Sequence, residues 1–158
     1  MYSLKYKFEI FFDTDVFFEH IKGKHKDQIS LLDKSRKIFQ GCYTSVINAS
    51  EVFAICKDDQ QMAETKNVFN GIGVLGIPFR YSVKIAEIMK AVKNKKTGNT
   101  YRDALLIAMC SETKLPLCTS KGKRYKDISK IFDVKIINTD LILKYDTPEA
   151  IFKKVKIL

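Results

Sequence analysis

Three carboxylates stand at comparable places along this chain of 158 residues, each beside the start of an expected helix. Asp13 follows a short apolar and aromatic segment, Glu51 lies one turn into a second helix, and Asp103 begins a third. Carboxylate oxygens are the hard ligands that Mg²⁺ and Mn²⁺ prefer. A metal held by such a cluster can position a water molecule and stabilise charge on a phosphate during phosphodiester cleavage.

Each of these acids also has a simpler explanation as a helix cap. Asp13 can cap the helix that follows it. The patterns Asn48-x-x-Glu51 and Thr100-x-x-Asp103 both resemble capping boxes, which place an acid three positions after the cap. The two roles are compatible, because the helix dipole keeps an acid at a helix N-terminus ionised.

Strands and helices alternate along the chain, with no repeat or linker that would divide it. The sequence predicts strands at 6–12, 42–46, 115–119 and 134–138, and a loop or short strand at 71–78. Helices are expected at 15–21, 28–40, 48–57, 59–69, 83–92, 101–113 and 127–132, and the tail 146–158 as a helix or an edge strand. The alternation predicts an α/β fold with a mainly parallel sheet covered on both faces.

Sites in parallel sheets form beyond the carboxyl ends of the strands. This rule directs attention to 13–15, to the region of Ser45, and to 119–121. We expect one domain over 1–158, in which the motifs lie at about 6–138 and a C-terminal tail covers 139–158.

The net charge of +10 suggests an anionic partner: nucleic acid, a membrane surface or an acidic protein. Basic residues gather in two segments that fold order places beside the strand-end crevice: Lys93, Lys95 and Lys96, then Lys121, Lys123, Arg124 and Lys126. Tyr101 and Tyr125 are placed to stack on RNA bases. The alternative is an ordinary solvated face, because lysine is abundant throughout the chain.

Several features indicate a cytoplasmic protein that does not enter a membrane. Charged residues interrupt the first 13 positions, where a signal peptide would be apolar. The longest apolar run, 104–110, is far shorter than the roughly 20 residues needed to cross a bilayer. The four cysteines form no C-x-x-C pair, and we expect Cys110 and Cys118 to be reduced core residues.

Four short motifs in order make the chain similar to the PIN domain, the ribonuclease fold of VapC-type toxins. They are FFDTDV at 11–16, SVINASEV at 45–52, RDALLIA at 102–108 and LPLCTSK at 115–121. The resemblance implies a three-layer α/β/α sandwich and a Mg²⁺ or Mn²⁺ ion held by Asp13, Glu51 and Asp103. It also implies a homodimer and a small antitoxin protein that lies over the active-site groove.

The chain departs from the family pattern at two places. Lys121 occupies the position of the fourth acid, and Arg124-Tyr125 replaces an Asp-Phe pair. The lysine ammonium either weakens metal binding or contacts the scissile phosphate. Asp15, where the family often has Asn, can restore an acidic group, although a solvated residue at a helix start is the simpler explanation.

The leading hypothesis is a metal-dependent endoribonuclease with catalytic Asp13, Glu51 and Asp103 and with Asp15 as a further metal ligand. The expected RNA contacts are Lys121, Lys123, Arg124, Lys95, Lys96, Ser45 and Thr119. The alternative is a PIN-like module that has lost catalysis but still binds RNA or a protein. A response-regulator receiver is a third possibility, but the segment 71–78 lacks the phospho-acceptor aspartate that it requires.

Overall fold

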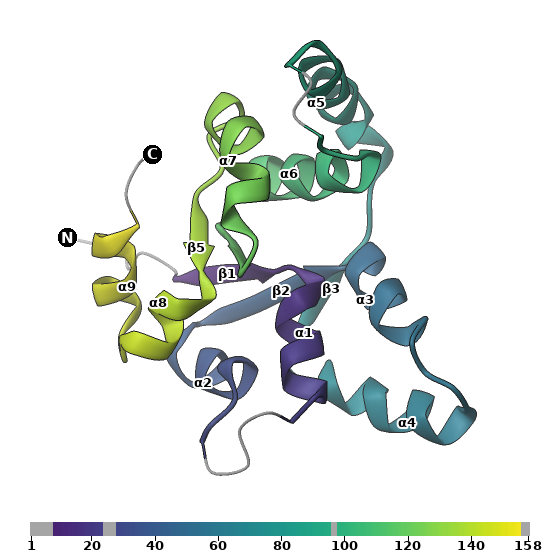
Figure 1. Cartoon of the computed structure of the whole chain (residues 1–158), viewed down its shortest axis with the longest axis vertical. Coiled ribbons are helices and arrows are strands. Elements are labelled where there is room, and N and C mark those ends of the chain that lie inside the picture. The colour runs from purple at the N-terminus through teal and green to yellow at the C-terminus, as the bar shows by residue number, and fades with distance from the viewer. Residues whose placement is uncertain (1–7, 24–27, 96–97, 156–158) are drawn as a thin grey trace, which may run out of the picture.

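The computed structural model describes residues 8–23, 28–95 and 98–155. Five parallel strands form one sheet in the order β3-β2-β1-β4-β5 (Figure 1). The strands are β1 (Glu9–Phe12), β2 (Gly41–Ser45), β3 (Gly73–Leu75), β4 (Leu117–Thr119) and β5 (Ile136–Asn138). The expected α/β fold with a parallel sheet is confirmed.

The strand order reverses at the central strand. The chain moves from β1 outward through β2 to β3, and then crosses to β4 on the other side of β1. The carboxyl ends of β1 and β4 therefore border the switch point, where open parallel sheets form a crevice. Asp13 directly follows β1, and Ser120 directly follows β4.

Helices cover both faces of the sheet, so the fold is an α/β/α sandwich with the sheet as its middle layer (Figure 1). One face carries α5 (Ser82–Lys95), α6 (Tyr101–Thr113), α7 (Gly122–Ile131) and the 3₁₀ turn η1 (Phe79–Tyr81). The other carries α1 (Thr14–Ile21), α2 (Leu31–Ile38), α4 (Asp59–Val68), α8 (Thr139–Lys144) and α9 (Pro148–Lys154). Helix α3 (Val46–Phe53) follows β2 at the carboxyl end of the sheet.

Alternating side chains of β1 divide the core into two clusters. Ile10 and Phe12 point to the α1 and α2 face, whereas Phe11 points to the α6 face. All three are fully buried, as expected for a central parallel strand. Helix α6 is buried along nearly its whole length, which confirms the prediction made from its apolar composition.

Three local differences from the sequence-based expectations lie at helix ends. Ser45, not Asn48, is the N-cap of α3, because the Ser45 hydroxyl accepts from the Asn48 amide. Helix α7 begins at Gly122 instead of 127, and its N-cap Lys121 provides no side-chain cap that the sequence could have revealed. Helix α5 continues through Lys95 into the expected loop 93–99. The segment 71–78, expected as a loop or short strand, contains the short strand β3, which pairs with β2.

The C-terminal segment 139–155 is helical and packs on the sheet. Ile142 of α8 and Ile151 of α9 are both fully buried in the cluster beneath β1. The tail 146–158 was expected as a helix or an edge strand, and its described part forms α9. None of the helices in the described ranges is long and apolar enough to cross a membrane.

Candidate active site

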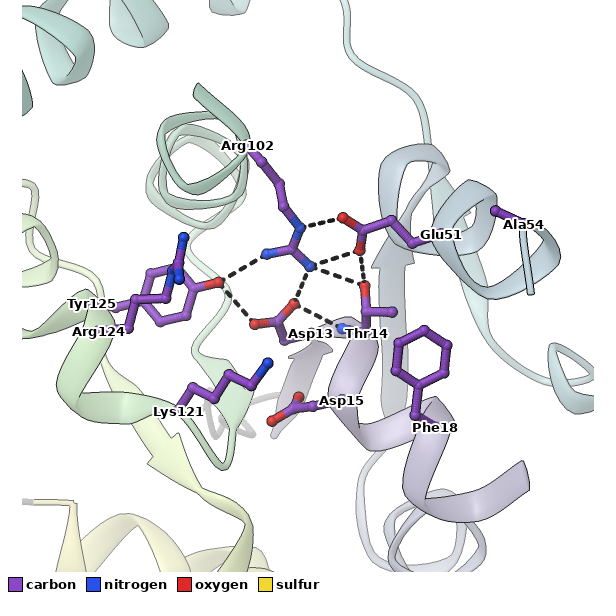
Figure 2. A pocket seen from close by; sticks show the side chains of 10 residues that line it. All are labelled: Asp13, Thr14, Asp15, Phe18, Glu51, Ala54, Arg102, Lys121, Arg124 and Tyr125. Carbon is purple, nitrogen blue, oxygen red and sulfur yellow. Dashed lines mark hydrogen bonds and ion pairs between the residues drawn. The ribbon is translucent and has the colours of Figure 1, made fainter. Parts of the chain in front are cut away.

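A pocket of about 450 Å³ opens at the carboxyl end of the sheet, beside the switch point (Figure 2). Charged side chains of both signs dominate its lining. It is lined by Asp13, Thr14, Asp15, Phe18, Glu51, Ala54, Arg102, Lys121, Arg124 and Tyr125. The sequence motifs at 11–16, 45–52, 102–108 and 115–121 thus converge on one place.

Asp13 is almost completely buried and is held in one orientation by several donors. As the N-cap of α1, it accepts from the Thr14 amide at 2.7 Å, which confirms its predicted capping role. The same oxygen, Oδ1, accepts from Arg102 Nη2 at 2.6 Å and from Asn48 Nδ2 at 3.3 Å. Oδ2 accepts from the Tyr125 hydroxyl at 2.8 Å. The carboxylate is therefore fixed before any ligand arrives.

Glu51 points from the second turn of α3 toward Asp13 and does not cap its own helix. Its two carboxylate oxygens accept from Nε and Nη2 of Arg102, and the Thr14 hydroxyl donates to it as well. Burial disfavours its ionised form, but the Arg102 and Thr14 hydrogen bonds and the Arg102 charge outweigh this, so the pKa of Glu51 lies below its usual value. Glu51 is an ionised carboxylate at the pocket wall.

Asp103 is completely buried at the start of α6. It forms the predicted capping box with Thr100, whose amide donates to Oδ2 at 3.0 Å. Arg124 Nε donates to the same oxygen at 2.8 Å. The other oxygen, Oδ1, has no hydrogen-bond partner in the described part of the chain and lies 3.8 Å from Arg102 Nη1. A buried acceptor without a donor marks a place where a cation is favourable.

Arg102 is the residue that joins the three acids. Its Nη2 lies 2.6 Å from Asp13 and 2.7 Å from Glu51, its Nε binds Glu51, and its Nη1 is an ion-pair partner of Asp103. Figure 2 shows the guanidinium between the carboxylates of Asp13 and Glu51. The Tyr125 hydroxyl accepts from Nη1 at 3.0 Å. Burial lowers the pKa of Arg102, but the bonds to Glu51 and Asp13 raise it overall. A permanent positive charge occupies the acidic centre.

Asp15 and Lys121 lie on opposite sides of the pocket mouth. Asp15 Oδ2 accepts from the Ser120 amide at 2.7 Å and from the Ser120 hydroxyl at 2.5 Å, whereas its buried Oδ1 has no hydrogen-bond partner among the described residues. The Lys121 side chain is exposed and extends its ammonium toward the two aspartates (Figure 2). The lysine that replaces the family's acid thus faces the same pocket.

Two of the expected RNA contacts are buried. Ser45 is completely buried at the cap of α3, where its hydroxyl donates to Asn48. Thr119 is also buried, and its hydroxyl points to Asp13 at 3.3 Å and Asp15 at 3.1 Å. Neither side chain reaches the surface, so both are placed to position the acids and not to touch RNA.

The other expected RNA contacts divide between two helix ends. Lys121, Lys123 and Arg124 are exposed at the start of α7, beside the pocket. Lys96 and the side chain of Lys95 lie outside what the structure describes. Tyr125 was expected to stack on bases, but this is wrong: its side chain is completely buried, because α7 starts five residues earlier than predicted. Tyr101 is exposed and stays available for stacking.

Sequence reasoning missed the roles of Arg102 and Tyr125. Burial and the nearby Asp13 charge raise the pKa of Tyr125, so its hydroxyl keeps its proton and acts as a hydrogen-bond donor. The signal for Arg102 was its place next to Asp103 in the first turn of α6, which aims its side chain at the strand ends. The direction of that side chain and its partners were not readable from the sequence.

The donor set has the right chemistry for a hard divalent cation, but its present arrangement does not hold one. Carboxylate oxygens converge here, as Mg²⁺ and Mn²⁺ require, and Asp103 Oδ1 offers an unpaired buried acceptor. No group of three or more metal-binding side chains is spaced as a metal site within the described residues. The reason is visible in the contacts: Arg102 fills the position that the oxygens of Asp13 and Glu51 share.

The fold is an α/β protein whose parallel sheet carries a charged pocket at its switch point. The sequence matches the PIN domain family over residues 10–131, which is most of the chain. This protein belongs to the PIN domain family, whose members are generally nucleases. A comparison with curated proteins gives no match.

Solved structures with the same fold include three toxin–antitoxin complexes. VapBC2 from Rickettsia felis, bound to a DNA fragment from its promoter, has a TM-score of 0.67 at 16% identity over 82% of this chain and 98% of that chain. VapBC-1 from nontypeable Haemophilus influenzae has a TM-score of 0.66 at 12% identity over 84% and 98%. A complex from Klebsiella pneumoniae has a TM-score of 0.56 at 21% identity over 75% and 92%. At these identities the likeness shows a shared fold.

Proposed function

We propose that this protein is a metal-dependent endoribonuclease of the PIN toxin type, which cleaves RNA phosphodiester bonds at Asp13, Glu51 and Asp103. The observation that carries the proposal is the convergence of these acids, from three separate elements, on a single guanidinium. Buried like charges repel each other, so a fold that gathers them needs a cation at their centre. Arg102 supplies that cation in this structure, and in a nuclease family a catalytic metal would take its place.

The acids would hold the ion once Arg102 moves aside. When bound, Mg²⁺ or Mn²⁺ would supply an activated water and stabilise the charge that develops on the phosphate. The chain's own part is to fix the ligands: Tyr125 and Thr119 orient Asp13, and the capping box orients Asp103. Asp15 stands next to Asp13, with one oxygen unpaired, as the further acidic ligand.

The exposed cations at the pocket mouth suit the RNA backbone. Lys121 and Arg124 line the pocket, and Lys123 is exposed in the same turn of α7. Phosphate contacts by such side chains give affinity that depends on salt and little on sequence. The proposed RNA contacts also include Lys95 and Lys96, whose side chains lie outside what the structure describes. The proposal places the protein in the cytoplasm, where its RNA substrate is.

A second candidate function is supported by the arginines. Arg102 binds Asp13 and Glu51, Arg124 binds Asp103, and Lys121 replaces the fourth acid. A centre neutralised in this way suits a PIN-like module that binds RNA or a protein without cleaving it. The two candidates differ in one measurable property, because only the nuclease needs a metal.

The test is RNA cleavage by the purified chain in Mg²⁺, in Mn²⁺ and in EDTA. We expect cleavage with either metal and none in EDTA. The variants Asp13→Asn and Asp103→Asn should each reduce the rate by at least about 100-fold, because each removes a ligand of the ion that stabilises the transition-state charge. Asp140→Asn, at an exposed position on α8, is the matched control and should cleave normally.

Circular dichroism on each variant separates loss of activity from loss of fold. Cleavage that continues unchanged in EDTA, or in both variants, would contradict the nuclease proposal. RNA binding with no cleavage under any metal condition would favour the second candidate.

Partners of this protein are inferred from its fold and charge. The similar structures are toxin–antitoxin complexes, and we propose that a small antitoxin also inhibits this chain. A net charge of +10 suits an acidic partner segment. Homodimer formation is likewise proposed, on the basis of apolar side chains exposed at η1 and α5.

A further inference from the structure

The acidic centre already contains a cation that belongs to the chain. Three of the five N–H groups on Arg102 point to the oxygens of Asp13 and Glu51, and a fourth to the Tyr125 hydroxyl. Nη2 alone contacts both acids and also the Thr14 hydroxyl at 3.0 Å. A second cation cannot bind the same two oxygens while Nη2 lies against them.

The charge balance of the pocket also disfavours a metal ion while Arg102 is in place. Asp13, Asp15 and Glu51 contribute three negative charges to the lining, and Arg102, Lys121 and Arg124 contribute three positive charges. A divalent ion added to this balanced lining gains little attraction. If the guanidinium leaves the centre, the same acids present an excess of negative charge to the ion.

The Arg102 side chain is able to leave without unfolding the protein. It comes from the first turn of α6 and is 28% exposed, whereas Asp13 is 3% and Asp103 0% exposed at their side chains. Asp13 and Asp103 accept from backbone amides and, for Asp13, from the Tyr125 hydroxyl, and Glu51 keeps the bond from the Thr14 hydroxyl when Arg102 is absent. The ligands would therefore keep their positions while the guanidinium turns toward solvent.

We infer that Arg102 is the resident cation of the acidic centre, and that a divalent metal binds only by displacing its guanidinium. The inference rests on the proposed function, because it concerns the occupant of that metal centre. Arg102 is then a part of the chain that competes with the metal for the same acids. The metal affinity of the protein is then set by an arginine and not by the acids alone.

The first test is calorimetric titration of Mn²⁺ into the wild-type protein, Arg102→Met and Arg80→Met. Methionine is of similar length and uncharged. We expect Arg102→Met to bind Mn²⁺ at least about tenfold more tightly than the wild type, the change expected when one charge-assisted hydrogen bond no longer competes. Arg80 is exposed and does not line the pocket, so Arg80→Met should bind like the wild type.

The second test uses the wild-type chain, and so holds even if Arg102→Met does not fold. The Nε–H signal of Arg102 is followed by NMR during titration with Mg²⁺. We expect it to move from the position of a hydrogen-bonded group toward that of a solvated arginine. A signal that stays in place throughout the titration would overturn the inference.

The possible outcomes separate the inference from the function on which it rests. Equal Mn²⁺ affinity in the wild type and Arg102→Met would overturn the role of Arg102, while the proposed metal centre would stand. Absence of Mn²⁺ binding in a folded Arg102→Met protein would overturn both.

Discussion

Tyr125 forms hydrogen bonds with both Asp13 and Arg102 in the pocket. Its hydroxyl donates to Asp13 Oδ2 at 2.8 Å and accepts from Arg102 Nη1 at 3.0 Å, and its ring is completely buried. In Tyr125→Phe both ions lose this hydrogen-bond partner. We expect the free energy of unfolding to fall by about 1–2 kcal/mol, measured by urea denaturation.

A matched control is available in the same chain. Tyr101 is 59% exposed, so Tyr101→Phe should leave the free energy of unfolding unchanged within about 0.5 kcal/mol. Equal stability of Tyr125→Phe and the wild type would show that the hydroxyl is not a net stabilising member of the network.

Lys121 gives the second prediction at the residue scale, because it stands where the family has an acid. If its ammonium binds RNA phosphate, Lys121→Ala should weaken RNA binding and reduce the slope of log affinity against log salt by about one. If it is a neutral replacement, Lys121→Asp should instead tighten metal binding, because it adds a hard oxygen ligand. We expect the phosphate role.

Filter binding across a series of salt concentrations distinguishes the two roles. Lys153, exposed on α9, is far along the chain from the pocket lining, and Lys153→Ala serves as the control for loss of one charge. An unchanged slope and affinity in Lys121→Ala would eliminate the phosphate role.

At the scale of elements, the Tyr43 ring packs between β2 and β3 and limits how closely the residues of the two strands approach. The side chain of Tyr43 lies over Gly73, where an added Cβ would be only 2.6 Å from the ring. Gly73→Ala must therefore push the ring away or part the two strands. We expect a loss of about 1–3 kcal/mol in the free energy of unfolding, as for other overpacked sites.

Gly76 provides the control for this prediction. A Cβ built at Gly76 meets no atom within 4 Å, so Gly76→Ala should cause little change in thermal stability. Similar melting temperatures for the two alanine variants would mean that the ring moves aside at no cost.

At the scale of the whole molecule, one end of α5 is unusually apolar for a surface. Ile85 and Ile88 of this helix are buried against α6, which accounts for its amphipathic sequence. Phe79 of η1 and Val83 of α5 are nevertheless 92% and 71% exposed. Exposed apolar side chains of this kind are typical of interaction surfaces.

We therefore expect light scattering to give the mass of a homodimer, and Val83→Glu to shift the protein toward the monomer because it places a charge in the interface. Leu143→Glu, at a 48% exposed position on α8, should leave the mass unchanged. A wild-type monomer at all accessible concentrations would count against the dimer.

The sequence alone was enough to determine the class of fold and the order of the acids. Local periodicity predicts the strands and helices, and neighbours in the chain place Asp13 and Asp103 at the starts of helices. Glu51 lies in the second turn of the helix that follows β2. The placement of Asp13 as a cap and of Asp103 in a capping box followed from spacings of one to three residues. Relations between residues this close in the chain can be predicted without the tertiary structure.

Only the tertiary structure decided what stands between the acids. Arg102 is separated by 51 positions from Glu51 and by 89 from Asp13, so no local pattern predicts their contact. The same holds for Tyr125 of α7, whose buried hydroxyl reaches Asp13 across 112 positions. The charge and the hydrogen-bond partners at a strand-end crevice depend on which long side chains from distant helices meet there. The packing of those helices decides this.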